Sequence, residues 1–303
     1  MAMVSIATLF VFAVFLIPLA LTPSFRSSIT AAPDTVGLPY EAIDFSSGAP
    51  GNLGLPGWWI PADDPVGTVV VVHDGASNRS LIWEGGLTLL KRLQEARYSI
   101  LVFDLPGHGD APDAGNTPTG ANVAGAVVAA VDYARARNPN LPVSVHGFGL
   151  GGVAAIYAVA SESNVSALSV DSVWADLHNS LLQTVPDVTL IPAFVLAPSL
   201  LVSETVYGVD YAGSRPIDVI DDIDVPVLVI RNAADRQVLG SHSAELAAAA
   251  PRGDLWTTPA PPEAHPVYRE RGSWGTHTQS FNLDPDGYIT RLIGFYQMAG
   301  EVR

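Results

Sequence analysis

Apolar runs with strand-like spacing alternate along most of the chain with segments of helix-like spacing. Residues 68–72 form a continuous β-branched run, as expected for a strand buried on both faces, and residues 99–103 are predicted to form a second buried strand. Further strands are predicted at residues 143–146, 169–174, 225–230 and 255–257. Helices are predicted at residues 80–96, 120–137, 151–161, 241–249 and 286–297. This alternation predicts an α/β fold, with a mostly parallel sheet covered by helices on both faces.

One long interval interrupts the alternation. Residues 177–216 contain no strand pattern, and their apolar stretch 190–198 is broken by prolines. We interpret the interval as a small helical cap over the carboxyl edge of the sheet. The alternative is an ordinary long connection packed on the core. Residues 57–303 would then form one domain carrying this insertion, preceded by a tether and first strand over residues 22–56.

The first 21 residues are almost entirely apolar. About 20 such residues are enough to cross a bilayer as a helix. No Lys or Arg precedes the apolar run and no small-x-small cleavage site follows it, so we favour an uncleaved transmembrane anchor over a cleaved signal peptide. Arg26 is the only basic residue nearby and gives little guidance on orientation, and an extracytoplasmic domain is slightly favoured.

The amino-acid composition argues against some classes of binding partner and excludes some kinds of chemistry. The net charge is −15, and Lys91 is the only lysine, which argues against a nucleic-acid partner. The absence of cysteine excludes disulfides and thiolate chemistry. Several acids and histidines follow the predicted strands, and we expect them to form a hydrogen-bonded network rather than a metal site. They are His73, Asp74, Asp104, His108, Asp110 and His146. No cofactor or metal is predicted.

A glycine-rich turn follows the predicted strand 143–146. Residues 147–152 read Gly-Phe-Gly-Leu-Gly-Gly and match the dinucleotide fingerprint G-x-G-x-x-G. At least two strand–helix units precede this turn, whereas the fingerprint usually opens the first one. No acidic residue ends the following strand in a ribose-binding position, since Asp171 begins it. A nucleotide site is therefore kept only as a minor alternative.

Five separated motifs occur in an order that resembles the α/β-hydrolase superfamily. They are His73-Asp74-Gly75, Asp104-Leu105-Pro106-Gly107-His108-Gly109, the glycine turn, Asp235 and His265. The likeness extends from about residue 58 to residue 296 and is strongest to serine hydrolases similar to serine aminopeptidases and monoglyceride lipases. It implies an α/β-hydrolase fold and an ancestry among enzymes that cleave esters or peptides.

The resemblance also implies roles for particular residues. Gly149 matches the nucleophile position, where the family carries serine within Gly-x-Ser-x-Gly. Asp235 matches the acid of the triad and His265 its general base, with His277 as a weaker alternative. The main-chain N–H groups of Leu150 and Gly75 match the two donors of the oxyanion hole.

Two departures from the family pattern bear on activity. Gly149 has no atom that can attack a substrate, and Asp74 replaces the glycine usual after the histidine of the oxyanion loop, where its charge would repel a developing oxyanion. We therefore predict impaired or lost hydrolysis and a pocket for a small acyl or peptide-like ligand. The alternative is an active hydrolase or lyase in which a His265–Asp235 dyad activates water.

Overall fold

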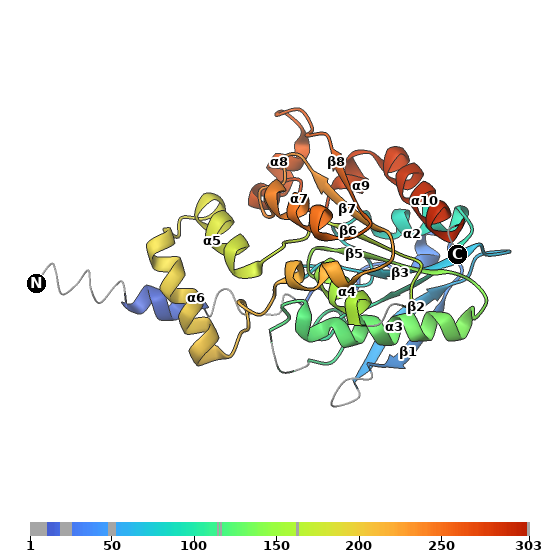
Figure 1. Cartoon of the computed structure of the whole chain (residues 1–303), viewed down its shortest axis with the longest axis horizontal. Helices are drawn as coiled ribbons and strands as arrows, with labels where there is room; N and C mark the ends of the chain where they lie inside the picture. Colours follow the sequence, from blue (N-terminus) through green and yellow to red (C-terminus); the bar gives the residue numbers. More distant parts are fainter. Residues whose placement is uncertain are drawn as a thin grey trace, which may run out of the picture.

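The computed structural model describes residues 11–18, 26–47, 53–113, 115, 117–161 and 164–301. Its centre is an eight-stranded sheet in the order β1-β2-β4-β3-β5-β6-β7-β8 (Figure 1). The strands are β1 (Glu41–Ser46), β2 (Gly54–Ile60), β3 (Gly67–Val72), β4 (Tyr98–Phe103), β5 (Val143–Phe148), β6 (Ala167–Asp171), β7 (Val227–Asn232) and β8 (Gly253–Thr258). Strand β2 pairs antiparallel with both β1 and β4, and all other pairs are parallel.

Helices cover both faces of the sheet, as predicted. The α-helices are α2 (Gly86–Glu95), α3 (Ala124–Arg137), α4 (Gly149–Ser161), α5 (Leu177–Val188), α6 (Ala193–Tyr207), α7 (Gly240–Ala249), α8 (Pro266–Glu270), α9 (Ser280–Leu283) and α10 (Pro285–Glu301). Short 3-10 turns are η1 (Pro33–Val36), η2 (Ala121–Val123), η3 (Pro216–Asp218), η4 (Ile220–Asp222) and η5 (Gly272–Trp274). Helices α3, α4 and α7 contribute to one apolar core cluster, and α2 and α10 contribute to the other.

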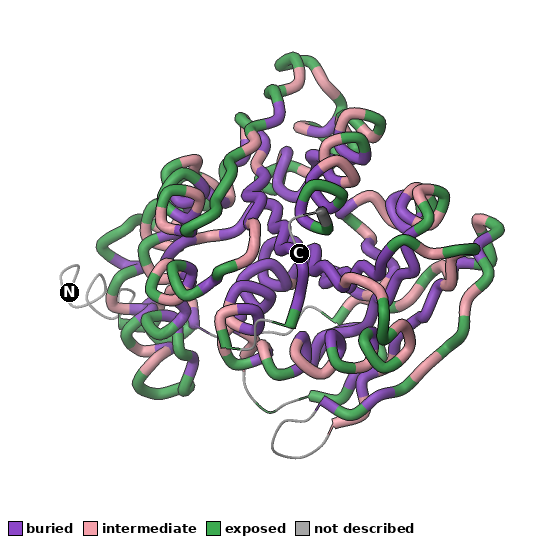
Figure 2. The backbone as a smooth tube through the Cα atoms, turned by 45° about the vertical axis from the view of Figure 1, so that its right-hand side comes forward, coloured by how far each residue is buried: buried purple, intermediate pink, exposed green. Residues whose placement is uncertain are grey.

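Strand β3 shows why the apolar runs form central strands. All six of its residues are buried. Figure 2 shows buried residues, in purple, gathered in the middle of the molecule. Val70 and Val72 belong to the cluster on one face of the sheet, whereas Val69 and Val71 belong to the cluster on the other. Successive side chains of a strand point to opposite faces, so a strand between two helical layers needs apolar residues at every position.

Left-handed residues change the bounds of two of the predicted elements. The helix predicted from residue 80 begins at Gly86, because residues 78–85 form a series of turns in which Leu81 has a φ of 52°. The strand predicted over residues 169–174 ends at Asp171, where Ser172 follows with a φ of 60°. Left-handed residues interrupt regular structure at these points, and apolar periodicity does not reveal them.

Helices α5 and α6 lie within the interval interpreted as a cap, and in Figure 1 they stand apart from the sheet layers. They share a small apolar cluster of Val185, Leu196, Leu200, Val209 and Tyr211. Helix α5 begins at an N-cap, Asp176, whose carboxylate accepts a hydrogen bond from the Asn179 N–H at 2.8 Å. Helix α6 begins directly after Pro192, the first of the prolines that break the apolar stretch.

The N-terminal apolar segment is only partly described. Residues 11–18 are helical, while residues 1–10 and 19–25 lie outside the described residues. Among the residues that the structure describes, no helix combines the length and apolar character needed to span a bilayer. The predicted transmembrane helix over residues 1–21 is therefore not supported by the described structure.

Candidate active site

The parallel strands bring three of the sequence motifs to one edge of the sheet. Strand β3 ends at Val72 and leads into His73-Asp74-Gly75, and β5 leads into Gly149. Strand β7 ends at Asn232, three residues before Asp235. Because the carboxyl ends of parallel strands meet at the same edge, these loops face a common space, as ligand sites in open α/β sheets do.

Gly149 forms the sharp turn between β5 and α4. Its φ is +44°, in the left-handed region that glycine adopts without the steric cost of a Cβ atom. A Cβ atom built on Gly149 would overlap the carboxylate of Asp74. The space beside this turn is thus already filled by a side chain from another loop.

The glycines around Gly149 have a packing role. A Cβ atom on Gly147 would collide with the backbone of Gly152, and one on Gly151 would collide with the main-chain carbonyl of His73. The G-x-G-x-x-G pattern is thereby explained by the close approach of β5, α4 and the β3 loop. This packing gives the pattern a cause that needs no nucleotide.

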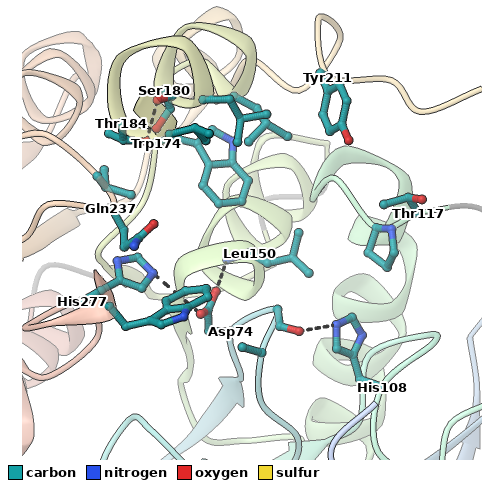
Figure 3. A pocket seen from close by; sticks show the side chains of 18 residues that line it. Asp74, His108, Thr117, Leu150, Trp174, Ser180, Thr184, Tyr211, Gln237 and His277 are labelled. Carbon is teal, nitrogen blue, oxygen red and sulfur yellow. Dashed lines mark hydrogen bonds and ion pairs between the residues drawn. The ribbon is translucent and has the colours of Figure 1, made fainter. Parts of the chain in front are cut away.

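The two carboxylate oxygens of Asp74 face different partners (Figure 3). The N–H of Leu150 donates to Oδ1 at 2.9 Å, and Nε2 of His277 lies 3.7 Å from Oδ2. Burial opposes the charge of Asp74, but hydrogen bonding and the charge of His277 outweigh it, and the pKa falls to about 2. The Asp74 carboxylate is therefore ionised at neutral pH.

His277, and not His265, pairs with Asp235. Nδ1 of His277 donates to Oδ2 of Asp235 at 3.0 Å, and the N–H groups of Gln237 and Val238 donate to Oδ1 of Asp235 at 2.8 and 3.1 Å. Burial raises the pKa of Asp235, but His277 more than compensates, so the pKa lies below its usual value. Asp235 thus occupies the position predicted for the acid that orients a histidine.

Two carboxylates hold the His277 ring in its charged form. The side chain is buried between Asp235 and Asp74. Burial disfavours the imidazolium, yet the two anions raise the pKa of His277 to about 10. At neutral pH the site holds an anion–cation–anion row: Asp74, His277 and Asp235.

The prediction of His265 as the partner of Asp235 is wrong. His265 is the N-cap of α8, and its Nδ1 accepts a hydrogen bond from the Val267 N–H at 3.2 Å. His277 lies just before α9, at the end of the long connection that follows β8. His277 is the weaker of the two alternatives predicted from the sequence, and its position just before the final helices is the signal that points to it.

The two predicted oxyanion donors both contact the Asp74 carboxylate. The N–H of Leu150 makes the 2.9 Å bond described above, and the N–H of Gly75 also stabilises the charged form of Asp74. The main-chain carbonyl of Gly75 lies 2.9 Å from Nε2 of His108, which fixes the orientation of this loop. Both N–H groups therefore already interact with an anion, the Asp74 carboxylate.

Glu84 is a buried acid behind this loop, and no sequence motif singles it out. Its carboxylate accepts hydrogen bonds from the N–H of Asp74 at 2.8 Å, from the hydroxyl of Ser77 at 2.8 Å and from the N–H of Trp83 at 3.0 Å. Burial and repulsion by Asp74 raise its pKa to about 7. Through these bonds Glu84 fixes the backbone that carries Asp74.

The remaining acids and histidines of the predicted network also have hydrogen-bond partners. Asp104 pairs with Arg79, Nε2 of His73 accepts from the Leu105 N–H at 3.0 Å, and Nδ1 of His146 lies 2.7 Å from the hydroxyl of Ser169. Within the described part of the chain, no three His, Asp or Glu side chains are arranged to hold a metal ion.

A cavity of about 260 Å³ opens above the Asp74–His277 pair, towards the cap helices (Figure 3). Its lining is mainly apolar, and His108 and His277 are the basic residues among the described residues that line it. The apolar lining residues include Leu150, Trp174, Leu177, Leu181, Val185 and Val238. Such a surface favours an uncharged, largely apolar ligand.

Comparison with known proteins identifies the family. The alpha/beta hydrolase family matches residues 69–290, which is more than half of the chain, and the protein belongs to that family. YfhR of Escherichia coli O157:H7, a protein without an assigned activity, is 26% identical over 215 residues. That match covers 68% of this chain and 66% of YfhR, just under two thirds of its length.

Solved structures show the same fold at low sequence identity. The esterase Pf2001 of Pyrococcus furiosus superposes with a TM-score of 0.70 and 19% identity, covering 90% of this chain and 97% of the esterase. The acylaminoacyl peptidase of Pyrococcus horikoshii gives a TM-score of 0.59 and 14% identity, covering 86% of this chain and 41% of the peptidase. The protein thus belongs to the α/β-hydrolase family and shares its fold with an esterase and a peptidase.

Proposed function

We propose that this protein does not hydrolyse acyl substrates through a serine acyl-enzyme, and that its pocket binds a small, largely apolar ligand above the Asp74–His277 pair. In this proposal Gly149 stands at the nucleophile position of the family. The proposal depends mainly on the Asp74 carboxylate, which occupies the space beside Gly149 and takes up the hydrogen bond of the Leu150 N–H.

Physical chemistry supports the loss of serine-type catalysis. Removal of the serine costs on the order of a millionfold in a known protease. A negative charge in the oxyanion hole also opposes the electrostatic stabilisation on which acyl transfer depends. The start of α4 offers no replacement for the serine, because none of its first four residues has a nucleophilic side chain. They are Gly149, Leu150, Gly151 and Gly152.

A serine-directed reagent tests this proposal. We expect a fluorophosphonate to leave every serine of the folded wild-type protein unmodified, as measured by intact mass. Turnover of p-nitrophenyl butyrate should equal the background rate and should be the same in His277→Ala. Stoichiometric phosphonylation of one serine would contradict the proposal. Ester turnover that His277→Ala abolishes would instead favour water activation by the His277–Asp235 dyad.

We also propose that the N-terminal apolar segment attaches the protein to a membrane. The helix of residues 11–18 lies beside α6, where the Tyr207 hydroxyl contacts the main-chain carbonyl of Phe15 at 3.4 Å (Figure 1). Exposed apolar side chains lie on both elements. They are Val11, Phe12, Phe15, Leu16, Phe194, Leu201 and Val206. Burial of such a surface in the acyl region of a bilayer is favourable.

Vesicle flotation measures this attachment. The full chain should float with neutral phosphatidylcholine vesicles, because apolar burial rather than charge drives the association. A variant lacking residues 1–25 should remain in the dense fraction. Equal flotation of the two proteins, or none for the full chain, would contradict membrane attachment through this segment.

A further inference from the structure

A second cavity adjoins the cavity beneath the cap helices, at the loop after β3. Its volume is about 380 Å³, and the two cavities share Asp74, Ala76 and Trp274 in their linings. The other lining residues come from the segment before β1, the turns before α2 and the end of α8. They are Ser27, Trp83, Glu270 and Arg271. Of the described residues that line the second cavity, none belongs to α5 or α6, so its surroundings differ from those of the first.

Arg271 brings an unpaired positive charge to the second cavity. Its Nη1 donates to the main-chain carbonyl of His277 at 2.5 Å. Within the part of the chain that the structure describes, its Nε and Nη2 have no hydrogen-bond acceptor, and its guanidinium forms no ion pair. Burial lowers its pKa, whereas the negative charges of Asp74, Glu84 and Asp235 raise it. Arginine stays charged at neutral pH in proteins, so the cavity contains a cation whose remaining donors lack acceptors.

The two acids that line the second cavity interact with other basic groups. The carboxylate of Asp74 lies beside the charged ring of His277. Glu270 has an exposed side chain, and its carboxylate lies 4.0 Å from the guanidinium of Arg269. Neither acid therefore pairs with Arg271, although the nearby charge of Asp74 weakens the attraction of Arg271 for a further anion.

Two tryptophans form the apolar part of the lining. Trp83 is 42% exposed and Trp274 is 40% exposed, although both rings are large and apolar. The guanidinium carbon of Arg271 lies over the Trp83 ring, 5.3 Å from its centroid, and Trp83 Nε1 donates to the Ala76 carbonyl at 3.0 Å. Stacking on an anchored ring orients the guanidinium and leaves N–H donors in its own plane available to a ligand.

We propose that the second cavity binds a small organic acid, with its carboxylate paired to Arg271 and its apolar body against the rings of Trp83 and Trp274. The planar guanidinium presents parallel N–H groups that match the two oxygens of a carboxylate. An apolar body removes exposed tryptophan surface from water on binding. The site is separate from the ligand position above the Asp74–His277 pair, and acid binding here does not require the proposed function.

A matched pair of ligands measures the contribution of the negative charge. At pH 7 the full chain should bind 3-phenylpropionate about 10-fold more tightly than the neutral 3-phenylpropionamide, because only the acid forms a charge-assisted pair. Isothermal titration calorimetry gives both dissociation constants. Equal affinity, tighter binding of the amide, or binding of neither ligand would overturn the proposal. Tighter binding of the cation 3-phenylpropylammonium would also overturn it, since the acids of the lining would then set the charge preference.

Arginine variants at and beside the cavity test the partner of the carboxylate. Arg271→Gln should weaken binding of the acid about 10–100-fold and leave that of the amide unchanged. Arg271→Lys should recover part of the loss, since it keeps the charge without the planar fork. Arg269→Gln is the matched control, because Arg269 is exposed and does not line the cavity. Equal weakening of acid and amide in Arg271→Gln would overturn the proposal, because the arginine would then only support the His277 loop.

A variant of the first cavity tests where the acid binds. Leu181 lines the first cavity and not the second, so Leu181→Trp should partly fill the first cavity and leave the dissociation constant of 3-phenylpropionate unchanged. Loss of acid binding in folded Leu181→Trp would place the acid beneath the cap helices and overturn the proposal. The comparison of acid and amide in the wild-type protein does not depend on the folding of any variant.

Discussion

The double variant Gly149→Ser/Asp74→Gly is expected to hydrolyse short acyl esters about 10²–10³-fold faster than Gly149→Ala/Asp74→Gly, which differs from it by one hydroxyl. Restoring the serine returns the attacking atom, whose removal costs on the order of a millionfold in a known protease. Replacing Asp74 frees the Leu150 N–H for an oxyanion and removes the carboxylate that a side chain at residue 149 would overlap. The expected gain is only part of the full loss, since nothing else in the pocket has been adapted.

The single variants separate the two causes. Gly149→Ser alone should gain nothing, because its side chain meets the Asp74 carboxylate at a backbone φ of +44° that already disfavours a Cβ atom. Asp74→Gly alone should also gain nothing, since it lacks a nucleophile. The measurement is the rate of p-nitrophenyl butyrate hydrolysis, with circular dichroism and thermal unfolding to show that each variant is folded. A double variant no faster than its alanine counterpart would show that residue 149 is not aligned with His277 for acyl transfer.

The strands of this fold could be predicted because their burial is continuous. Four consecutive valines at residues 69–72 are all buried, as expected for a strand that lies between two helical layers. The turn at Gly149 could be predicted from its glycines, since close approach of β5, α4 and the β3 loop excludes side chains at several positions. Chain order then places Asp235 at the same edge of the sheet.

The identity of the histidine could not be settled from the sequence. Both His265 and His277 lie in the connection between β8 and α9, which has no regular periodicity over most of its length. Which one returns to Asp235 depends on how the chain turns through α8 and η5, and that is decided by tertiary contacts. One such contact is the bond that Nη1 of Arg271 donates to the main-chain carbonyl of His277 at 2.5 Å.

Only part of the role of Asp74 could be predicted from the sequence. The motif His73-Asp74-Gly75 predicts a negative charge beside the oxyanion donors, and such a charge would repel an oxyanion. The direction of its side chain depends on the vacant space at Gly149 and on His277, which is more than 200 residues away in sequence. The motif alone reveals neither the hydrogen bond that Asp74 accepts from the Leu150 N–H nor its approach to His277.

The pKa of His277 in an Asp74→Asn variant is expected to fall by about 1–3 pH units from its wild-type value of about 10. The asparagine keeps the shape of the side chain and removes one of the two anions that hold the imidazolium, while burial continues to disfavour the charge. NMR titration of ¹⁵N-labelled histidine measures the change. Asp176→Asn is the matched control, since Asp176 is a buried acid whose partners are Asn179 and Arg215.

The raised pKa of His277 also makes the stability of the folded protein depend on pH. Because the pKa of His277 is raised on folding, its proton stabilises the folded state fully below the unfolded value of about 6.5, and this contribution is lost as the pH rises towards 10. In Asp74→Asn the loss should be complete at a lower pH, so thermal unfolding of the two proteins should diverge most near neutral pH and converge towards pH 10. A His277 that titrates alike in both proteins would mean that the Asp74 charge does not act on the ring.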